Sequence, residues 1–153
     1  MLFRSEDIPH FIVTKLGMVF QVFDTNHSSS TFNDSKVDKK QIKIAIENLG
    51  WLKRDGMIDR YNDWLGNSYK LEPSEILSKR WRNHQYWHTY TSKQMESLKN
   101  LVDKLCEEYN IPKEFIGHNT YDENIDLFKG ITFRSNYYPE ATDVSPAFDM
   151  SIF

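Results

Sequence analysis

Residues 91–109, TSKQMESLKNLVDKLCEEY, carry the clearest periodic pattern in the chain and decide its fold class. Thr91 and Gln94 fit a capping box at the start, and apolar residues then recur at spacings of three and four. These apolar positions are Met95, Leu98, Leu101, Val102, Leu105, Cys106 and Tyr109. Pro112 cannot continue a helix and restricts the residue before it. We therefore predict an amphipathic helix of about 18 residues, roughly 27 Å long, with Cys106 in the core.

The sequence before this helix has two stretches with strand character. Residues 10–23 contain two β-branched and aromatic runs separated by a turn at Gly17, which predicts a β-hairpin. Residues 41–48 alternate, with three isoleucines on one side, which predicts a strand with one apolar face. The polar residues 24–40 between them have the composition of a loop.

The remaining segments have weaker patterns. Residues 51–90 show no clean period and are interrupted by glycine and proline, so we expect irregular structure with a short hairpin. We predict a strand at 130–134 and a structured turn at 143–149. Strands followed by a long helix indicate an α/β fold, with a central mixed β-sheet flanked by helices. We expect residues 1–153 to form a single domain.

The composition excludes several classes of protein. The 153 residues include 19 Lys and Arg against 22 Asp and Glu, a net charge of −3, and the length suits one globular domain. No window has the roughly 18 consecutive apolar residues of a membrane span. No Lys/Arg run exceeds two residues, which argues against nucleic-acid binding. A single cysteine, Cys106, excludes a disulfide framework and a four-thiolate zinc site.

Histidines and tryptophans are the candidate site residues that stand out from the sequence alone. The histidines are His10, His27, His84, His88 and His118. His84 and His88 have the spacing that places two imidazoles on one helical face around a metal. However, the residues after them suit extended backbone, and Gln85 cannot act as a general base, so loop histidines are the simpler interpretation. The four tryptophans lie in the middle third of the chain, where core packing explains them more simply than sugar stacking.

Six short motifs follow one another along the chain. They are HFIV at 10–13 followed by Gly17, IKIAIENLG at 42–50, YTSKQ at 90–94, YNIP at 109–112, IGH at 116–118 and DVSPAF at 143–148. Their types and order resemble the zinc-dependent N-acetylmuramoyl-L-alanine amidases. This type-2 amidase family also contains peptidoglycan recognition proteins and some phage lysozymes. The similarity spans nearly the whole chain, although each motif is weak by itself.

The resemblance implies a site and a substrate. His118 and Asp143 match positions that bind zinc in the family. Zinc-bound hydroxide would attack the amide between the N-acetylmuramoyl lactyl group and L-alanine of peptidoglycan. We assign Trp87 and Asn48 to substrate binding.

The chain also departs from the family pattern. The usual first zinc ligand lies on a strand upstream of the hairpin, and this sequence begins after that point, so we expect an N-terminally shortened amidase domain. A third ligand would then come from His10 or His27, from an N-terminal extension or from a partner chain. Three positions that assist catalysis in other members are occupied here by Pro9, Ala45 and Ala141.

The insertion between the two predicted ligands offers replacements for the lost lysine. Arg134 or Lys129 could stabilise the negative charge that develops on the attacked carbonyl oxygen. Glu47 would act as a general base only if it faced the cleft, and a solvated carboxylate is the simpler interpretation.

These observations leave two main function classes open. One is an active amidase, such as a bacterial or bacteriophage endolysin. The other is a catalytically inactive relative that binds peptidoglycan or forms part of a virion. A metallohydrolase site at His84 and His88 is a third, weaker hypothesis. The sequence start lacks the apolar core of a signal peptide. We therefore expect synthesis in the cytoplasm, with action at the cell wall or within a particle.

Overall fold

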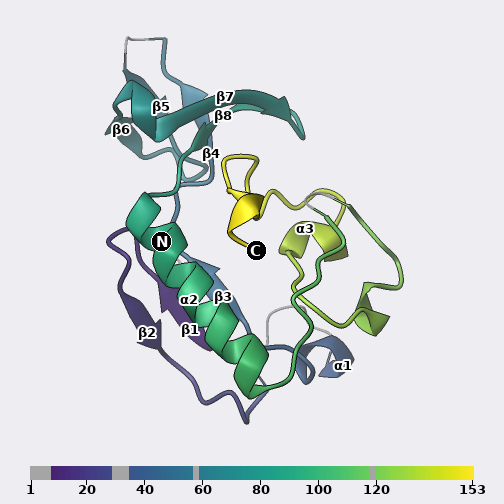
Figure 1. Ribbon diagram of the computed structural model, residues 1–153. Helices are drawn as coiled ribbons and strands as arrows, with labels where there is room; N and C mark the ends of the chain where they lie inside the picture. Colours follow the sequence, from purple (N-terminus) through teal and green to yellow (C-terminus); the bar gives the residue numbers. More distant parts are fainter. Residues whose placement is uncertain (1–7, 29–34, 57–58, 118–119) are drawn as a thin grey trace. The chain divides into compact units, whose positions relative to one another are not determined.

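The computed structural model describes residues 8–28, 35–56, 59–117 and 120–153 (Figure 1). The chain forms two compact units. The first combines Met1–Glu47 with Thr91–Leu101, and the second combines Asn48–Tyr90 with Val102–Phe153. One domain over residues 1–153 stays a prediction.

Short strands and one long helix make up the secondary structure, so the predicted α/β fold class is confirmed. The strands are β1 (Phe11–Val13), β2 (Val19–Gln21), β3 (Ile44–Ile46), β4 (Trp51–Arg54), β5 (Arg60–Asn62), β6 (Ser68–Lys70), β7 (Ile76–Trp81) and β8 (His84–His88). The helices are α1 (Ser35–Asp38), α2 (Ser92–Glu108) and α3 (Arg134–Tyr137), with 3₁₀ turns η1 (Pro73–Glu75), η2 (Ile125–Leu127) and η3 (Met150–Ile152).

The first unit contains a three-stranded sheet in the order β2-β1-β3. β1 and β2 are antiparallel, which confirms the predicted hairpin, whereas β1 and β3 are parallel. Gly17 in the hairpin turn has a φ of +80°. A Cβ at this position would lie 2.8 Å from the carbonyl oxygen of Lys93, so the turn requires glycine for both conformation and space.

Helix α2 begins and ends close to the predicted residues. The hydroxyl of Thr91 accepts a hydrogen bond from the Gln94 backbone N–H at 3.1 Å, the N-cap interaction that the sequence predicts. The Gln94 side chain donates instead to the carbonyl oxygens of Glu47 at 2.7 Å and Val13 at 3.4 Å. It thereby fastens the start of the helix to the strand ends of the first unit.

Two predictions for the first unit need correction. The predicted loop at 24–40 contains α1, and residues 29–34 lie outside the described part of the chain. The predicted strand at 41–48 is reduced to β3, whose isoleucines are only partly buried. The buried residue in this segment is Lys43, because its ammonium group forms an ion pair with the buried carboxylate of Asp38.

The second unit contains a five-stranded antiparallel sheet in the order β6-β5-β4-β8-β7 (Figure 1). The prediction of irregular structure for 51–90 was therefore wrong. Each strand is only three to six residues long and β7 carries an irregular register against β8, so no period of two extends far enough to be recognised. Leu52, Tyr61 and Leu71 form a small hydrophobic core in this part of the unit.

Three of the four tryptophans pack in the other part of this sheet, as the composition suggested, whereas Trp64 is exposed. Trp87 is completely buried, and its indole N–H donates to the carbonyl oxygen of Lys79 at 2.7 Å. Trp81 packs against Trp87 with ring centroids 5.2 Å apart, and Trp51 stacks on His84 at 4.3 Å. These rings pack the sheet rather than forming an exposed aromatic surface.

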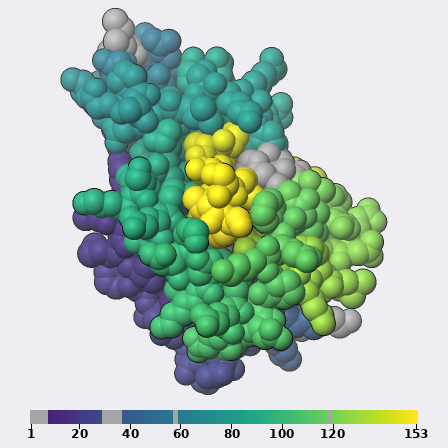
Figure 2. All heavy atoms as spheres, in the orientation of Figure 1, coloured from purple at the N-terminus to yellow at the C-terminus, as the bar shows by residue number. Residues whose placement is uncertain are grey.

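The C-terminal part of the second unit is held together by phenylalanines. Phe148 packs against Phe133, and Phe153 packs against Phe115, which places the C-terminal residues next to earlier parts of this unit (Figure 2). The predicted strand at 130–134 was wrong: Ile131 makes a single β-bridge to Phe115, and α3 begins at Arg134. The predicted turn at 143–149 is confirmed by a hydrogen bond from Phe148 N–H to the Ser145 carbonyl.

Candidate metal centre

Asn136 in α3 contacts the chain on both sides of His118. Its side-chain amide donates to the carbonyl oxygens of Gly117 at 3.2 Å and Thr120 at 2.7 Å. Its side-chain oxygen accepts from the Phe133 N–H at 2.8 Å, which fixes the orientation of the amide. His118 itself lies outside the described residues. Asn136 therefore binds Gly117 and Thr120, the described residues that flank this predicted ligand in the sequence.

The neighbouring residue of α3 holds the segment of the second predicted ligand. The Ser135 N–H donates to the carbonyl oxygen of Asp143 at 2.9 Å. Ser135 and Asn136 are both almost fully buried, whereas Asp143 is exposed. Two consecutive residues of one short helix thus bind the segments that contain His118 and Asp143. The sequence analysis missed this helix, although Ser and Asn near its start are typical of helix N-termini.

Tyr90 contacts the turn that follows Asp143. Its ring meets Phe148 edge-on at 5.4 Å, and its hydroxyl hydrogen-bonds with Ser145. Burial, with a smaller effect of the Asp143 charge, raises the pKa of Tyr90 to about 12. Tyr90 is therefore a neutral hydroxyl beside an acidic residue at neutral pH.

The cations near this region differ in their placement. Arg134 is the first residue of α3 and is partly buried, whereas Lys129 is exposed. The guanidinium of Arg82, which sequence analysis did not single out, donates to the carbonyl oxygens of Tyr138 and Ala141. Arg82 therefore ties the turn before Asp143 to the five-stranded sheet of the same unit.

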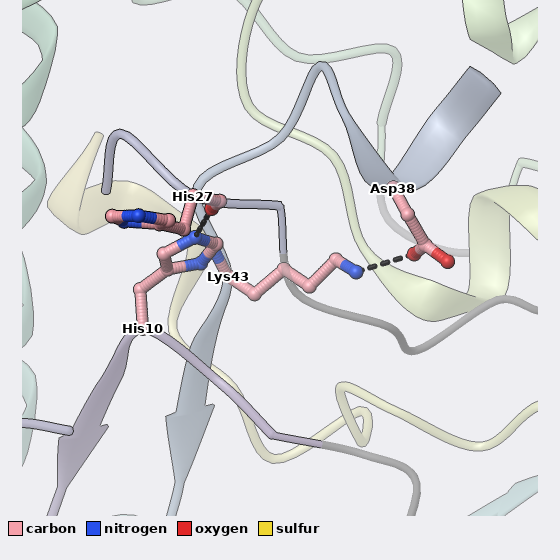
Figure 3. A network of polar contacts seen from close by, with 4 residues as sticks. All are labelled: His10, His27, Asp38 and Lys43. Atoms are coloured by element: carbon pink, nitrogen blue, oxygen red, sulfur yellow. Dashed lines mark hydrogen bonds and ion pairs between the residues drawn. The ribbon is translucent and has the colours of Figure 1, made fainter. Parts of the chain in front are cut away.

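His10 in the first unit is buried with both ring nitrogens engaged (Figure 3). Its Nδ1 accepts from the Lys43 backbone N–H at 3.0 Å, and its Nε2 lies 2.9 Å from the carbonyl oxygen of His27. These partners require a neutral ring with the proton on Nε2. His10 would have to break one of these bonds to bind a metal.

His27 contributes its backbone carbonyl to this network, and its ring is exposed. Phe23 packs against both histidine rings, with centroid distances of 5.9 Å to His10 and 5.8 Å to His27. The role of either histidine as a third ligand stays a prediction.

His84 and His88 lie on the single strand β8. Four residues of extended backbone separate their Cα atoms by about 13 Å, which is too far for two ligands of one ion without a change in the strand. His84 instead stacks on Trp51, and His88 is buried. This geometry gives no support to the metallohydrolase hypothesis at these two residues.

Three further predicted residues have clear structural partners. The Asn48 amide donates to the carbonyl oxygens of His88 and Thr89 and accepts from Gly50 N–H. Trp87 could contact substrate only if it became exposed. The exposed Glu47 carboxylate accepts from the Lys15 N–H at 2.7 Å. Substrate binding by Asn48 and Trp87 stays a prediction.

No group of three His, Cys, Asp or Glu side chains that could hold a metal is found among the residues that the structure describes, a set that omits His118. Within the same residues, no helix combines the length and apolar character of a membrane span.

The family model for N-acetylmuramoyl-L-alanine amidase matches residues 4–127, a range that contains His118 and ends before Asp143. No curated protein and no solved structure matches the chain. Because the family match covers most of the sequence, the protein belongs to the N-acetylmuramoyl-L-alanine amidase family.

Proposed function

We propose that this protein hydrolyses the amide between the N-acetylmuramoyl lactyl group and L-alanine in peptidoglycan, with zinc held by His118 and Asp143. Family membership supports a peptidoglycan amidase-like function. The observation that carries the metal assignment is the pair Ser135 and Asn136, because these adjacent residues bind the two ligand segments.

The donor groups suit the ion that is typical of the family. An imidazole nitrogen and a carboxylate oxygen are both common zinc ligands. Bound zinc would supply a water of lowered pKa as the nucleophile. The remaining ligand is proposed to come from His10 or His27, an N-terminal extension or a partner chain.

Arg134 is the stronger candidate to stabilise the oxyanion. It directly precedes Ser135, whose N–H binds the Asp143 carbonyl, whereas Lys129 lies five residues earlier and is exposed. A guanidinium held close to the reacting carbonyl would stabilise the charge that develops on its oxygen. We therefore propose this role for Arg134, with Lys129 as the second candidate.

Zinc content and peptide release test the proposal together. The purified protein should carry one zinc per chain and release peptides that begin with L-alanine from cell walls. His118→Ala and Asp143→Ala should lose both properties. The matched controls are His84→Ala and Asp126→Ala, which lie outside the proposed ligand set and should keep them.

The opposite result would identify the second function class. Wall binding without zinc or peptide release would contradict hydrolysis and leave a catalytically inactive peptidoglycan-binding or virion-associated protein. Loss of zinc in the control variants as well would contradict the ligand assignment. Action at the bacterial wall, as a free lysin or as a particle component, is part of the same proposal.

A further inference from the structure

One face of strands β4, β5 and β6 gathers exposed basic and polar side chains. Cross-strand partners in an antiparallel sheet share a face. Arg60 opposes Lys70, and Asn62 opposes both Ser68 and Lys53. All of these except Asn62, which is partly buried, are exposed. We call this set, Lys53, Arg60, Asn62, Ser68 and Lys70, the basic face.

The cations of the basic face do not serve the stability of the sheet. Lys53, Arg60 and Lys70 form no ion pair with any residue that the structure describes. Arg60 and Lys70 are like charges in directly opposed positions, an arrangement that destabilises a sheet. A ligand with negative charges would relieve this repulsion.

The charge distribution along the sequence also favours an anionic ligand at this sheet. Residues 48–90 contain seven Lys and Arg against five Asp and Glu, a net charge of +2. The rest of the chain therefore carries −5, since the total is −3. An anionic polymer would be attracted to this sheet and repelled by the remainder of the molecule.

The β5–β6 hairpin also presents two apolar side chains at its tip. Trp64 is 52% exposed and Leu65 is 45% exposed, although both are large hydrophobic residues. A flat indole with one polar edge is suited to stacking on a sugar ring.

A buried carboxylate fixes the loop that carries them. One oxygen of Asp63 accepts from the backbone N–H groups of Leu65 and Asn67, both at 2.9 Å. The other accepts from the Asn67 side chain at 3.0 Å and the Tyr69 hydroxyl at 3.1 Å. Because the loop is already ordered, binding through Trp64 loses little conformational entropy.

We propose that the basic face and Trp64 form a second peptidoglycan-binding site, separate from the zinc ligands. The indole stacks on an amino sugar of the glycan strand, and Lys53, Arg60 and Lys70 bind carboxylates of the stem peptides. The choice of ligand rests on the proposed function, and the cations and exposed indole supply the matching chemistry. The site would hold the protein on its insoluble substrate between cleavage events.

Binding to purified, insoluble peptidoglycan tests this site. The wall is first stripped of phosphate-containing polymers, and sedimentation is measured with His118→Ala protein so that cleavage cannot remove the ligand. In this background, Trp64→Ala and the double variant Arg60→Ser/Lys70→Ser should each weaken binding about tenfold. The matched controls are Phe20→Ala, another exposed aromatic, and Lys93→Ser/Lys104→Ser, which removes two exposed charges from α2.

Binding measured at low and high salt distinguishes the charge contacts from the stacking contact of Trp64. At about 0.5 M salt the charge contribution should be largely screened. The deficit of Arg60→Ser/Lys70→Ser should therefore shrink, while that of Trp64→Ala remains. Thermal unfolding of Trp64→Ala, Phe20→Ala and the α2 control should match the parent protein, because these side chains are exposed. Arg60→Ser/Lys70→Ser should unfold at the same or a slightly higher temperature, because it removes the like-charge pair.

The outcomes distinguish this proposal from the hydrolytic one. Unchanged binding in the sheet variants, or equal losses in the controls, would overturn the second site. Binding that disappears when the phosphate polymers are stripped would also overturn it, because the ligand would then be a phosphate polymer. Hydrolysis of a small soluble muramoyl peptide by the sheet variants, with His118 intact, tests the zinc site alone and should equal that of the wild-type protein.

Discussion

Asn136 shows how one side chain can organise a region that the sequence leaves undefined. Its amide donates on both sides of His118, and its oxygen accepts from Phe133 N–H. All three bonds involve backbone groups, so they constrain the path of the chain directly. A buried amide with its bonds satisfied contributes to stability, whereas its removal leaves the buried Phe133 N–H and the partly buried carbonyl oxygens of Gly117 and Thr120 without this partner.

Replacing Asn136 by alanine should therefore affect both stability and metal binding. We expect a loss of about 2–3 kcal/mol in the free energy of unfolding, measured by urea denaturation of metal-free protein. Zinc affinity, measured by competition with a chelator, should fall by about tenfold or more because the His118 segment loses its support. Asn124→Ala, at an exposed position in the same insertion, is the control. Unchanged zinc affinity in a folded Asn136→Ala protein would contradict the positioning role.

Asp63 gives a prediction for pH. Burial alone would raise its pKa, but the hydrogen bonds from Asn67, Tyr69 and Leu65 together outweigh it and lower the pKa below the usual 3.8. Its stabilising contribution is therefore present above about pH 4 and lost as the pH falls through the lowered pKa.

Urea unfolding of the wild type and Asp63→Asn at pH 6 and pH 3 measures this effect. At pH 6 the free energy of unfolding of the wild type should exceed that of Asp63→Asn. At pH 3 the difference between the two proteins should be smaller. Asp126→Asn, an exposed carboxylate in η2, should not reproduce this pattern. A difference that is equal at both pH values would show that the charge of Asp63 is not what stabilises the hairpin.

At the scale of elements, helix α2 and the β1–β2 hairpin were predictable because their signals are local. A helix of this length repeats its apolar spacing several times, and a proline ends it. The hairpin needs only two short apolar runs and a glycine that can adopt positive φ. The sequence of the five-stranded sheet contains no repeated apolar spacing, because its strands are short. Its strands also pair residues that are far apart in the chain, such as Trp51 with Trp87.

A comparison of Gly17 with Gly50 distinguishes the cost of a strained backbone from the cost of steric crowding. Their φ values are similar, +80° and +76°, but only Gly17 has a neighbour against which a Cβ would pack too closely. Gly50→Ala should cost about 1 kcal/mol from the positive φ alone. Gly17→Ala should cost about 1–3 kcal/mol more, because the turn must move away from α2. Thermal or urea unfolding gives both values, and equal losses would contradict the role of the Lys93 contact.

At the scale of the whole molecule, Cys106 is a useful reporter because it is the chain's single cysteine. Its thiol is buried, and burial raises its pKa despite the opposing effect of Lys113. The prediction from sequence that Cys106 packs in the core is confirmed.

Alkylation of Cys106 should therefore depend on unfolding. At pH 8, iodoacetamide should react with the native protein about 100-fold or more slowly than with protein unfolded in urea. The rate should rise across the same denaturant range as the loss of helical circular dichroism. Fast reaction of fully helical protein would show that this part of α2 opens without global unfolding.

The sequence by itself determined the long helix, the hairpin, the α/β class and the resemblance to the amidase family. These depend on repeated spacing, turn residues and short motifs that are contiguous in the chain. The tertiary structure alone revealed the Lys43–Asp38 ion pair, the basic face and the link from α3 to the segments around His118 and Asp143. The ion pair and the α3 link join groups whose partners are chosen by chain folding, because burial makes unpaired polar groups too costly to leave apart. The basic face arises because strand register places side chains from three strands on one side of the sheet.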